Sequence, residues 1–174
     1  MNRERLTSGL DALGVAYDQT AIERFEAFHA ILDEYNQKMD LTAVLDEDER
    51  IDRHDLDSAA PLAKGLLVPG AKVIDVGTGA GFPGMPLRIL EPSIRLTLLD
   101  SLNKRLDWLN EVRISLGLTG IRTVHARAEE QAQMKGFRDS FDFATARAVA
   151  DLRLLAELCL PYVKVGGLFL SMKS

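Results

Sequence analysis

Residues 73–84 read Val73-Ile74-Asp75-Val76-Gly77-Thr78-Gly79-Ala80-Gly81-Phe82-Pro83-Gly84. A short apolar run, typical of a buried parallel strand, passes directly into a glycine-rich turn. Because glycine has no Cβ, four glycines in eight residues let the backbone turn tightly and come close to a ligand. In open α/β sheets, ligands bind beyond the carboxyl ends of the strands. The stretch therefore predicts a ligand site directly after the first strand of such a sheet.

The chain on the C-terminal side of this stretch alternates between short apolar runs and longer amphipathic ones. Strands are expected at Lys72–Val76, Ile94–Leu99, Arg122–His125, Phe141–Thr145 and Leu168–Met172. Helices are expected to begin near Pro83, Asn103, Ala128 and Asp151. Alternation of this kind is typical of an α/β fold with a mainly parallel, doubly wound sheet that helices cover on both faces.

The chain on the N-terminal side is expected to be helical. Apolar residues recur at three- and four-residue steps from about Thr20 to Met39, and Leu56–Leu67 reads as a further helix before a Pro-Gly turn. The acid-rich stretch Asp46–Asp57 is interpreted as a solvated helix face. The sequence contains no linker or repeat, so we expect residues 1–70 to pack on the sheet formed by residues 71–174, as one structural domain.

Composition narrows the class of protein. A chain of 174 residues, 47% hydrophobic and 27% charged, is typical of one soluble globular domain. The net charge of −5 excludes a globally basic nucleic-acid coat, although a local basic patch is still compatible with it. The single cysteine, Cys159, excludes an internal disulfide and is expected to be buried and inert. The three histidines are dispersed, and no signal or membrane-spanning segment is visible, so we expect a cytoplasmic protein without a metal site.

The glycines also match the dinucleotide-binding pattern, as Gly79-x-Gly81-x-x-Gly84. The register of this match is wrong, because a fingerprint that starts at the end of the strand, at Gly77, has Phe82 at its third glycine position. Pro83 and Pro86 also remove backbone N–H donors that a pyrophosphate would need. S-adenosylmethionine carries a sulfonium and an amino-acid end in place of a pyrophosphate, so its binding does not need these backbone donors. A nicotinamide-dependent oxidoreductase stays as the alternative.

Two acids complete the predicted cofactor site. Asp75 ends the first strand, where its carboxylate could attract the ammonium of a methionine moiety or hold the glycine loop. Asp100 closes the second strand and could accept hydrogen bonds from both hydroxyls of a ribose. Each acid could also be an ordinary cap or loop anchor. Together with the loop, they predict S-adenosylmethionine as the cofactor.

Longer strings carry a resemblance to a known family. Residues 73–87 and the string Leu98-Leu-Asp-Ser-Leu-Asn-Lys-Arg105 resemble the bacterial 16S ribosomal RNA guanine-N7 methyltransferases, the RsmG or GidB family. Further matches are Arg53-His54-x-x-Asp57-Ser58, Arg127-Ala128-Glu129-Glu130 and Ala144-Thr-Ala-Arg147-Ala148, so the resemblance covers nearly the whole chain. It implies a class I, Rossmann-like methyltransferase. The implied substrate is a guanine in the decoding-region loop of 16S rRNA, within the 30S subunit or an assembly intermediate, and we expect the enzyme to act as a monomer.

The resemblance also implies roles for single residues. Together, the loop and the resemblance predict a cofactor pocket of Asp75, Gly77, Gly79, Phe82, Asp100, Ala128, Glu129 and Arg147. Ala128 and Glu129 are expected to border the adenine, and Arg147 is expected to face the cofactor and the target base. Guanine N7 carries no proton, so methyl transfer to it needs positioning and no general base. Arg147 is therefore the candidate catalytic residue, because bidentate hydrogen bonds from it could orient the guanine or the cofactor carboxylate.

The chain departs from the family pattern in three places. Asp40-Leu41-Thr42 stands where Asn-Leu-Thr is usual, and Ala146 replaces a serine. Family members continue past Met172 with two strands that complete a seven-stranded sheet, and we expect these strands to be missing here. A shortened cofactor-binding remnant without full activity is therefore a second alternative. RNA contacts are expected from basic residues near the strand ends, namely Arg88, Lys104, Arg105, Arg113 and Arg122.

Overall fold

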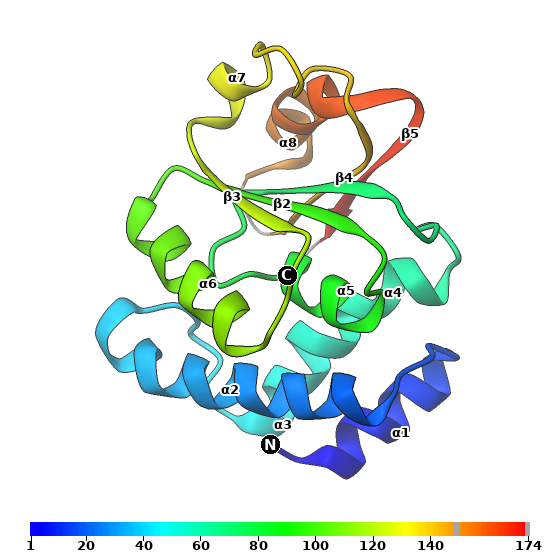
Figure 1. The fold of residues 1–174 in the computed structure, drawn as a ribbon, viewed down its shortest axis with the longest axis vertical. Helices are drawn as coiled ribbons and strands as arrows, with labels where there is room; N and C mark the ends of the chain where they lie inside the picture. The colour runs from blue at the N-terminus through cyan, green and yellow to red at the C-terminus, as the bar shows by residue number, and fades with distance from the viewer. Residues whose placement is uncertain (148–149, 173–174) are drawn as a thin grey trace.

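A five-stranded parallel sheet forms the centre of the molecule (Figure 1). The computed structural model describes residues 1–147 and 150–172. The strands are β1 (Lys72–Val76), β2 (Arg95–Asp100), β3 (Ile121–His125), β4 (Phe141–Arg147) and β5 (Val163–Met172). Their spatial order is β3-β2-β1-β4-β5, and every pairing is parallel. The expected α/β class and parallel sheet are therefore confirmed.

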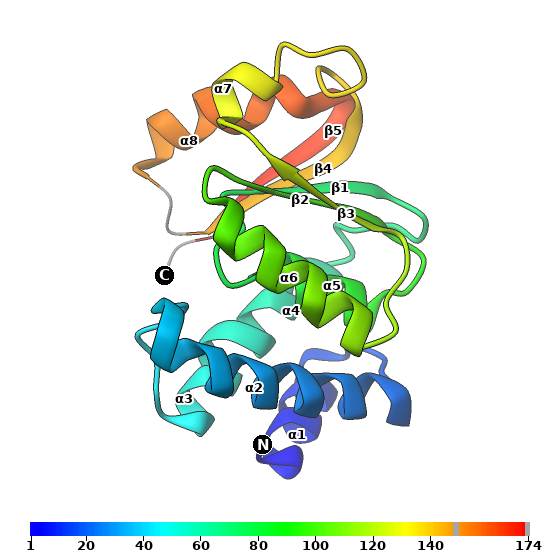
Figure 2. The same ribbon diagram turned by 60° about the vertical axis from the view of Figure 1, so that its left-hand side comes forward.

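Helices cover both faces of this sheet (Figures 1 and 2). One face carries the N-terminal helices together with the two helices that connect β1 to β3. These elements are α1 (Arg3–Leu13), α2 (Gln19–Met39), α3 (Glu47–Arg50), η1 (Ile51–Leu56), α4 (Asp57–Ala63), α5 (Gly84–Leu90) and α6 (Asn103–Ser115). The other face carries α7 (Ala128–Gln131), α8 (Leu152–Cys159) and the 3₁₀ turn η2 (Leu160–Tyr162).

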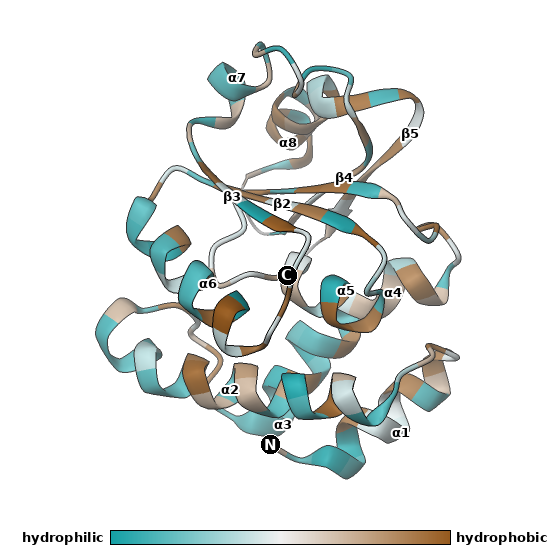
Figure 3. Cartoon of the chain, viewed as in Figure 1, coloured by the Kyte–Doolittle hydropathy of each residue, from teal (hydrophilic) through white to brown (hydrophobic). Residues whose placement is uncertain are grey.

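The two faces have separate cores, and alternation along β1 assigns its residues to them. Val73 packs with the N-terminal helices, whereas Ile74 and Val76 pack under α8. Asp75 lies on the same face as Val73 by this alternation, and it is fully buried. Figure 3 shows the consequence for polarity, since the strands are mainly hydrophobic whereas α3 and α7 are largely hydrophilic. None of the helices in residues 1–147 and 150–172 is long and apolar enough to cross a membrane.

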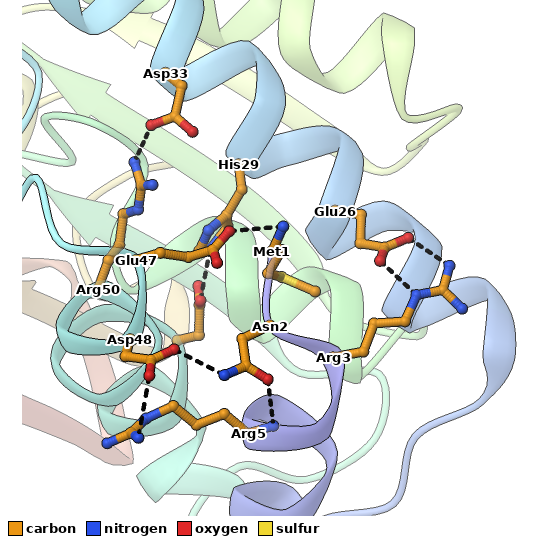
Figure 4. Close-up of polar contacts among 11 residues, drawn as sticks. Met1, Asn2, Arg3, Arg5, Glu26, His29, Asp33, Glu47, Asp48 and Arg50 are labelled. Atoms are coloured by element: carbon orange, nitrogen blue, oxygen red, sulfur yellow. Dashed lines mark hydrogen bonds and ion pairs between the residues drawn. The ribbon is translucent and has the colours of Figure 1, made fainter.

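The acid-rich stretch Asp46–Asp57 is only partly a solvated helix face, so that interpretation was wrong for two of its residues. Asp55 is fully buried, and its Oδ2 lies 2.6 Å from Nε2 of the buried His29. The buried guanidinium of Arg50 donates to Asp33 of α2 at 2.5 Å (Figure 4). Within this stretch η1 is a π-helix, whose wider turn changes which residues face inward. Spacing in the sequence therefore did not identify Asp55 and Arg50 as buried, and their partners on α2 offset the cost of burying charge.

Candidate active site

A cleft of about 640 Å³ opens at the carboxyl edge of the sheet, where the chain order reverses between β1 and β4. Cofactor sites in open α/β sheets lie at this switch point, and their volumes run from roughly 300 to 1,000 Å³. The lining residues are Leu41, Val76, Gly77, Gly79, Leu99, Asp100, Ser101, Arg105, Ala126, Arg127, Ala128, Glu129, Arg147 and Leu158.

Most of the residues predicted for the pocket meet in this cleft. Those that line it are Gly77, Gly79, Asp100, Ala128, Glu129 and Arg147. Asp75 and Phe82 are not among the lining residues, and both are buried behind the glycine loop. Sequence reasoning missed Leu41, which follows α2, and Leu158 of α8. An isolated leucine in or after an amphipathic helix reads as an ordinary core residue, so no local pattern marked either one.

Asp100 is joined to the glycine loop by its carboxylate. Its Oδ2 accepts the N–H of Gly79 at 2.9 Å, and its Oδ1 accepts the N–H of Leu102 at 2.9 Å. Gly79 has φ +57°, a left-handed backbone conformation that glycine adopts without strain. A carboxylate offers about four lone-pair sites, so Asp100 keeps acceptor capacity for two hydroxyl groups in the cleft.

Asp75 supports the same loop from behind. Its Oδ2 accepts the hydroxyl of Thr78 at 2.7 Å and the N–H of Gly84 at 3.0 Å. A Cβ at position 84 would lie 2.8 Å from this oxygen, so only glycine lets the start of α5 approach so closely. Asp75 was expected either to attract the ammonium of a methionine moiety or to hold the glycine loop, and its contacts are those of a residue that holds the loop. Burial raises its pKa to about 6, although the bonds from Thr78 and Gly84 act in the opposite direction.

The pKa of Asp75 predicts a pH dependence of stability. Its pKa is about 6 in the folded protein against an ordinary value of 3.8, so the folded state binds the proton more tightly. The stabilisation from this proton is complete below about pH 4 and is lost as the pH rises through 6. We expect the unfolding free energy of the unsubstituted protein, relative to that of Asp75→Asn, to fall by about 2 kcal/mol between pH 4 and 7.5. Urea denaturation at both pH values measures this, and a constant difference would contradict it.

Arg147, at the end of β4, joins the sheet to the N-terminal helices. One terminal nitrogen, Nη2, donates to Oδ2 of Asp57 at 2.8 Å and to the hydroxyl of Ser58 at 3.0 Å. The other, Nη1, donates to the carbonyl of Arg53 at 3.2 Å. Its Nε is buried and has no protein partner among the described residues. Burial lowers the pKa of Arg147, and the carboxylate of Asp57 opposes this shift, so a guanidinium whose Nε–H is uncommitted lines the cleft.

Phe82 packs into the core on the other side of the loop. Its ring stacks on His54 with 4.7 Å between centroids and lies 5.3 Å from the ring of Phe28. His54 is held in turn by Thr42, whose Oγ1 lies 2.9 Å from Nε2. Burial, followed by the charge of Arg147, lowers the pKa of His54, which favours the neutral ring. Phe82 thus contacts the N-terminal helical region and supports the loop from the core side.

The basic residues expected near the strand ends do not gather in one place, and the expectation of an RNA contact is wrong for Arg88. Arg88 is buried, and its guanidinium donates to the carbonyl of Thr119 at 2.8 and 3.1 Å. Arg122 lies near the amino end of β3, at the other edge of the sheet. Arg105 lines the cleft, with Nη1 3.7 Å from the carboxylate of Asp100. Cys159 is buried as expected, and burial raises its pKa to about 12, which keeps it a thiol.

Comparison with known proteins identifies the family. The GidB family, described as rRNA small subunit methyltransferase G, matches residues 21–174. The chain belongs to this family. Ribosomal RNA small subunit methyltransferase G of Caldanaerobacter subterraneus subsp. tengcongensis is 46% identical over 170 residues, which are 98% of this chain and 71% of the relative. The protein of the same name from Acetivibrio thermocellus is 48% identical over 173 residues, 98% of this chain and 70% of the relative.

Solved structures agree on the fold. A putative S-adenosyl-L-methionine-dependent methyltransferase from Methanococcus maripaludis superposes with a TM-score of 0.61 at 13% identity, over 87% of this chain and 64% of that one. A putative caffeoyl-CoA O-methyltransferase from Staphylococcus aureus gives a TM-score of 0.58 at 16% identity, over 82% and 64% of the two chains. These likenesses show the Rossmann-like class I fold alone. The family match confirms the resemblance read from the sequence strings.

Proposed function

We propose that this protein transfers a methyl group from S-adenosylmethionine to N7 of a guanine in the decoding-region loop of 16S rRNA. The observation that carries the proposal is the cleft at the strand switch point of a chain that belongs to the GidB family. A predicted binding residue lines the cleft at or just after the carboxyl end of each of β1, β2, β3 and β4. The named relatives are ribosomal RNA small subunit methyltransferases, which supports the substrate class.

The residues of the cleft fit S-adenosylmethionine. Asp100 has acceptor capacity for the two ribose hydroxyls, and Ala128 with Glu129 lies one strand further along, where the adenine would be bordered. The buried Nε of Arg147 is a donor without a protein acceptor among the described residues. A carboxylate oxygen of the cofactor or an oxygen of the target base could therefore accept its hydrogen bond. When bound, the cofactor supplies a methyl group on a positively charged sulfur. The nicotinamide-dependent alternative is not favoured, because the relatives and structural neighbours are methyltransferases.

Methyl transfer to guanine N7 requires the protein mainly to position the cofactor and the target base. Guanine N7 attacks through a lone pair and releases no proton, so no general base is needed. Holding two reactants in attack geometry supplies roughly 7 to 11 kcal/mol of barrier reduction. Arg147 is the proposed catalytic residue, since its guanidinium is fixed by Asp57 and Ser58 and faces the cleft. Leu41 and Leu158 supply apolar wall that excludes water from the same space.

We extend the proposal to the context of the reaction. The protein acts in the cytoplasm as a monomer, on the 30S subunit or an assembly intermediate of it. Residues 1–70 and 71–174 work as one unit, which the bonds between Arg147 and Asp57 support. The named relatives supply the ribosomal RNA substrate class.

A tritiated-methyl transfer assay tests the proposal. The substrate is 30S subunits from cells that lack the methyl mark, with already methylated subunits as the control, and the modified base is then mapped. We expect label at N7 of one guanine in 16S rRNA of the unmodified subunits only. Cofactor binding without any transfer would instead favour a cofactor-binding protein without methyltransferase activity, and binding of NADH in place of S-adenosylmethionine would favour the oxidoreductase.

A further inference from the structure

Three cationic side chains gather at the edge of the sheet opposite the cleft. Lys72, Arg95 and Arg122 line a hollow of about 330 Å³. They lie at the amino ends of β1, β2 and β3. Lys72 is the register partner of Arg95, and Arg122 is the partner of Thr97, two residues beyond Arg95. Since side chains alternate between faces, all three cations stand on the same face of the sheet.

Within the described part of the chain, acids neutralise this cluster only in part, through the charge of the nearby Asp142. None of the three side chains forms an ion pair there, and no aspartate or glutamate lines the hollow. Asp142 is close to the backbone of Lys72 but is already engaged: its Oδ1 pairs with Lys164, and its Oδ2 accepts the N–H of Lys72 at 2.7 Å. Partial burial, followed by the charges of Arg122 and Arg95, lowers the pKa of Lys72. The cations therefore repel one another across the hollow.

Aromatic rings hold two of the cations in place. Nζ of Lys72 lies 4.7 Å from the ring centroid of Phe141, and Cζ of Arg122 lies 4.5 Å from that of Phe137. Nε of Arg122 also donates to the hydroxyl of Thr97 at 2.8 Å. Among described residues, the terminal nitrogens of Arg122 and the ammonium of Lys72 donate to no protein acceptor. The donors are thus fixed in position and are free to bind a ligand.

We propose that this hollow binds neighbouring backbone phosphates of the RNA substrate, at a distance from the methyl-transfer cleft. The inference rests on the proposed function for the identity of the RNA. Arginine and lysine side chains both bind phosphate oxygens. Release of counterions from the RNA on binding offsets the free-energy cost of holding three like charges together. Five residues of strand separate the hollow from the cleft, which is roughly 15 Å at about 3.3 Å per residue. An acidic protein, with net charge −5, would thereby hold RNA through a local basic site.

Salt-dependent binding to an in vitro transcript of 16S rRNA tests the site with the variant Lys72→Gln/Arg95→Gln. Each lost phosphate contact lowers the slope of log affinity against log salt by about 0.7 to 0.9. Between about 50 and 200 mM salt, we expect the affinity of the unsubstituted protein to fall roughly tenfold more than that of the variant. The single variant Arg95→Gln changes one exposed residue whose side chain forms no hydrogen bond with the described residues, and should show a difference of roughly threefold.

The control variant is Lys64→Gln/Arg3→Gln, which removes the same charge from two exposed positions, one directly after α4 and one in α1, where the ion pair of Arg3 with Glu26 is also lost. It should keep the slope of the unsubstituted protein, and calorimetry should show unchanged S-adenosylmethionine binding in all variants. An unchanged slope in the Lys72/Arg95 variant, an equal change in the control, or no rRNA binding by the unsubstituted protein would each overturn the site. Failure of the proposed function is read separately, as absence of methyl transfer by the unsubstituted protein to 30S subunits.

Discussion

Replacing Asp100 with alanine should weaken S-adenosylmethionine binding by about 100-fold or more. The carboxylate is almost fully buried and already orders two segments of the cleft, through the N–H groups of Gly79 and Leu102. Its removal leaves both backbone donors and the ribose hydroxyls without their acceptor. Hydrogen bonds to a charged group contribute roughly 1.5 to 3 kcal/mol each, so losing two gives the stated factor. Isothermal titration calorimetry measures the change.

Two further variants separate ribose binding from loss of charge or of fold. Asp107→Ala removes the same charge from an exposed position on the neighbouring helix α6 and should keep the original affinity. Asp100→Asn keeps one acceptor oxygen and should fall between the alanine variant and the unsubstituted protein. Urea denaturation checks that each variant is folded. Unchanged affinity in a folded Asp100→Ala protein would refute the assignment to ribose.

The sheet could be predicted from the sequence because its signals are local. Apolar runs of strand length placed the starts of β1 to β4 within one residue of where the structure has them. The start of β5 was missed by five residues, since Gly166 and Gly167 interrupt the apolar pattern there. The register explains this: Val163 pairs with Phe141 and Leu168 with Phe143, so an irregular segment of β5 lies between two regular pairings. Gly166 has φ +82°, and a Cβ at position 167 would lie 2.7 Å from the carbonyl oxygen of Asp142, so the irregular segment itself requires glycine.

The cleft was predictable only where its residues follow directly from strand ends. Gly77, Gly79 and Asp100 belong to that class, and all three line the cleft. The contacts of Arg147 with Asp57 and Ser58 span 90 and 89 residues of sequence. The periodicity of a sequence does not reveal such a pair. The N-terminal segment was therefore expected only to cover the sheet, whereas it also holds Arg147 in place at the cleft. The burial of Asp55 was missed for the same reason, because its partner His29 lies on another helix.

Arg147→Ala should lower turnover by about 100- to 1,000-fold, the range found when a fixed donor to a reacting group is removed. The structure adds a second role for this side chain, since it ties β4 to Asp57, Ser58 and the Arg53 carbonyl. A loss of activity alone would therefore not distinguish orientation of the base or cofactor from loosening of the N-terminal helices. The measurement is the rate of methyl transfer to 30S subunits at saturating S-adenosylmethionine.

Asp57→Ala and Arg147→Lys separate the two roles. Asp57→Ala removes the main anchor of the guanidinium but keeps the guanidinium itself, so its loss of turnover should be well below that of Arg147→Ala. Arg147→Lys can keep an ion pair with Asp57 and hence most of the stability, but an ammonium cannot reproduce the planar, bidentate donors. Its turnover should stay close to that of Arg147→Ala. If lysine restored turnover, or if Asp57→Ala were as damaging as Arg147→Ala, the residue would be a structural tie between β4 and the helices, because only orientation requires the geometry of the guanidinium.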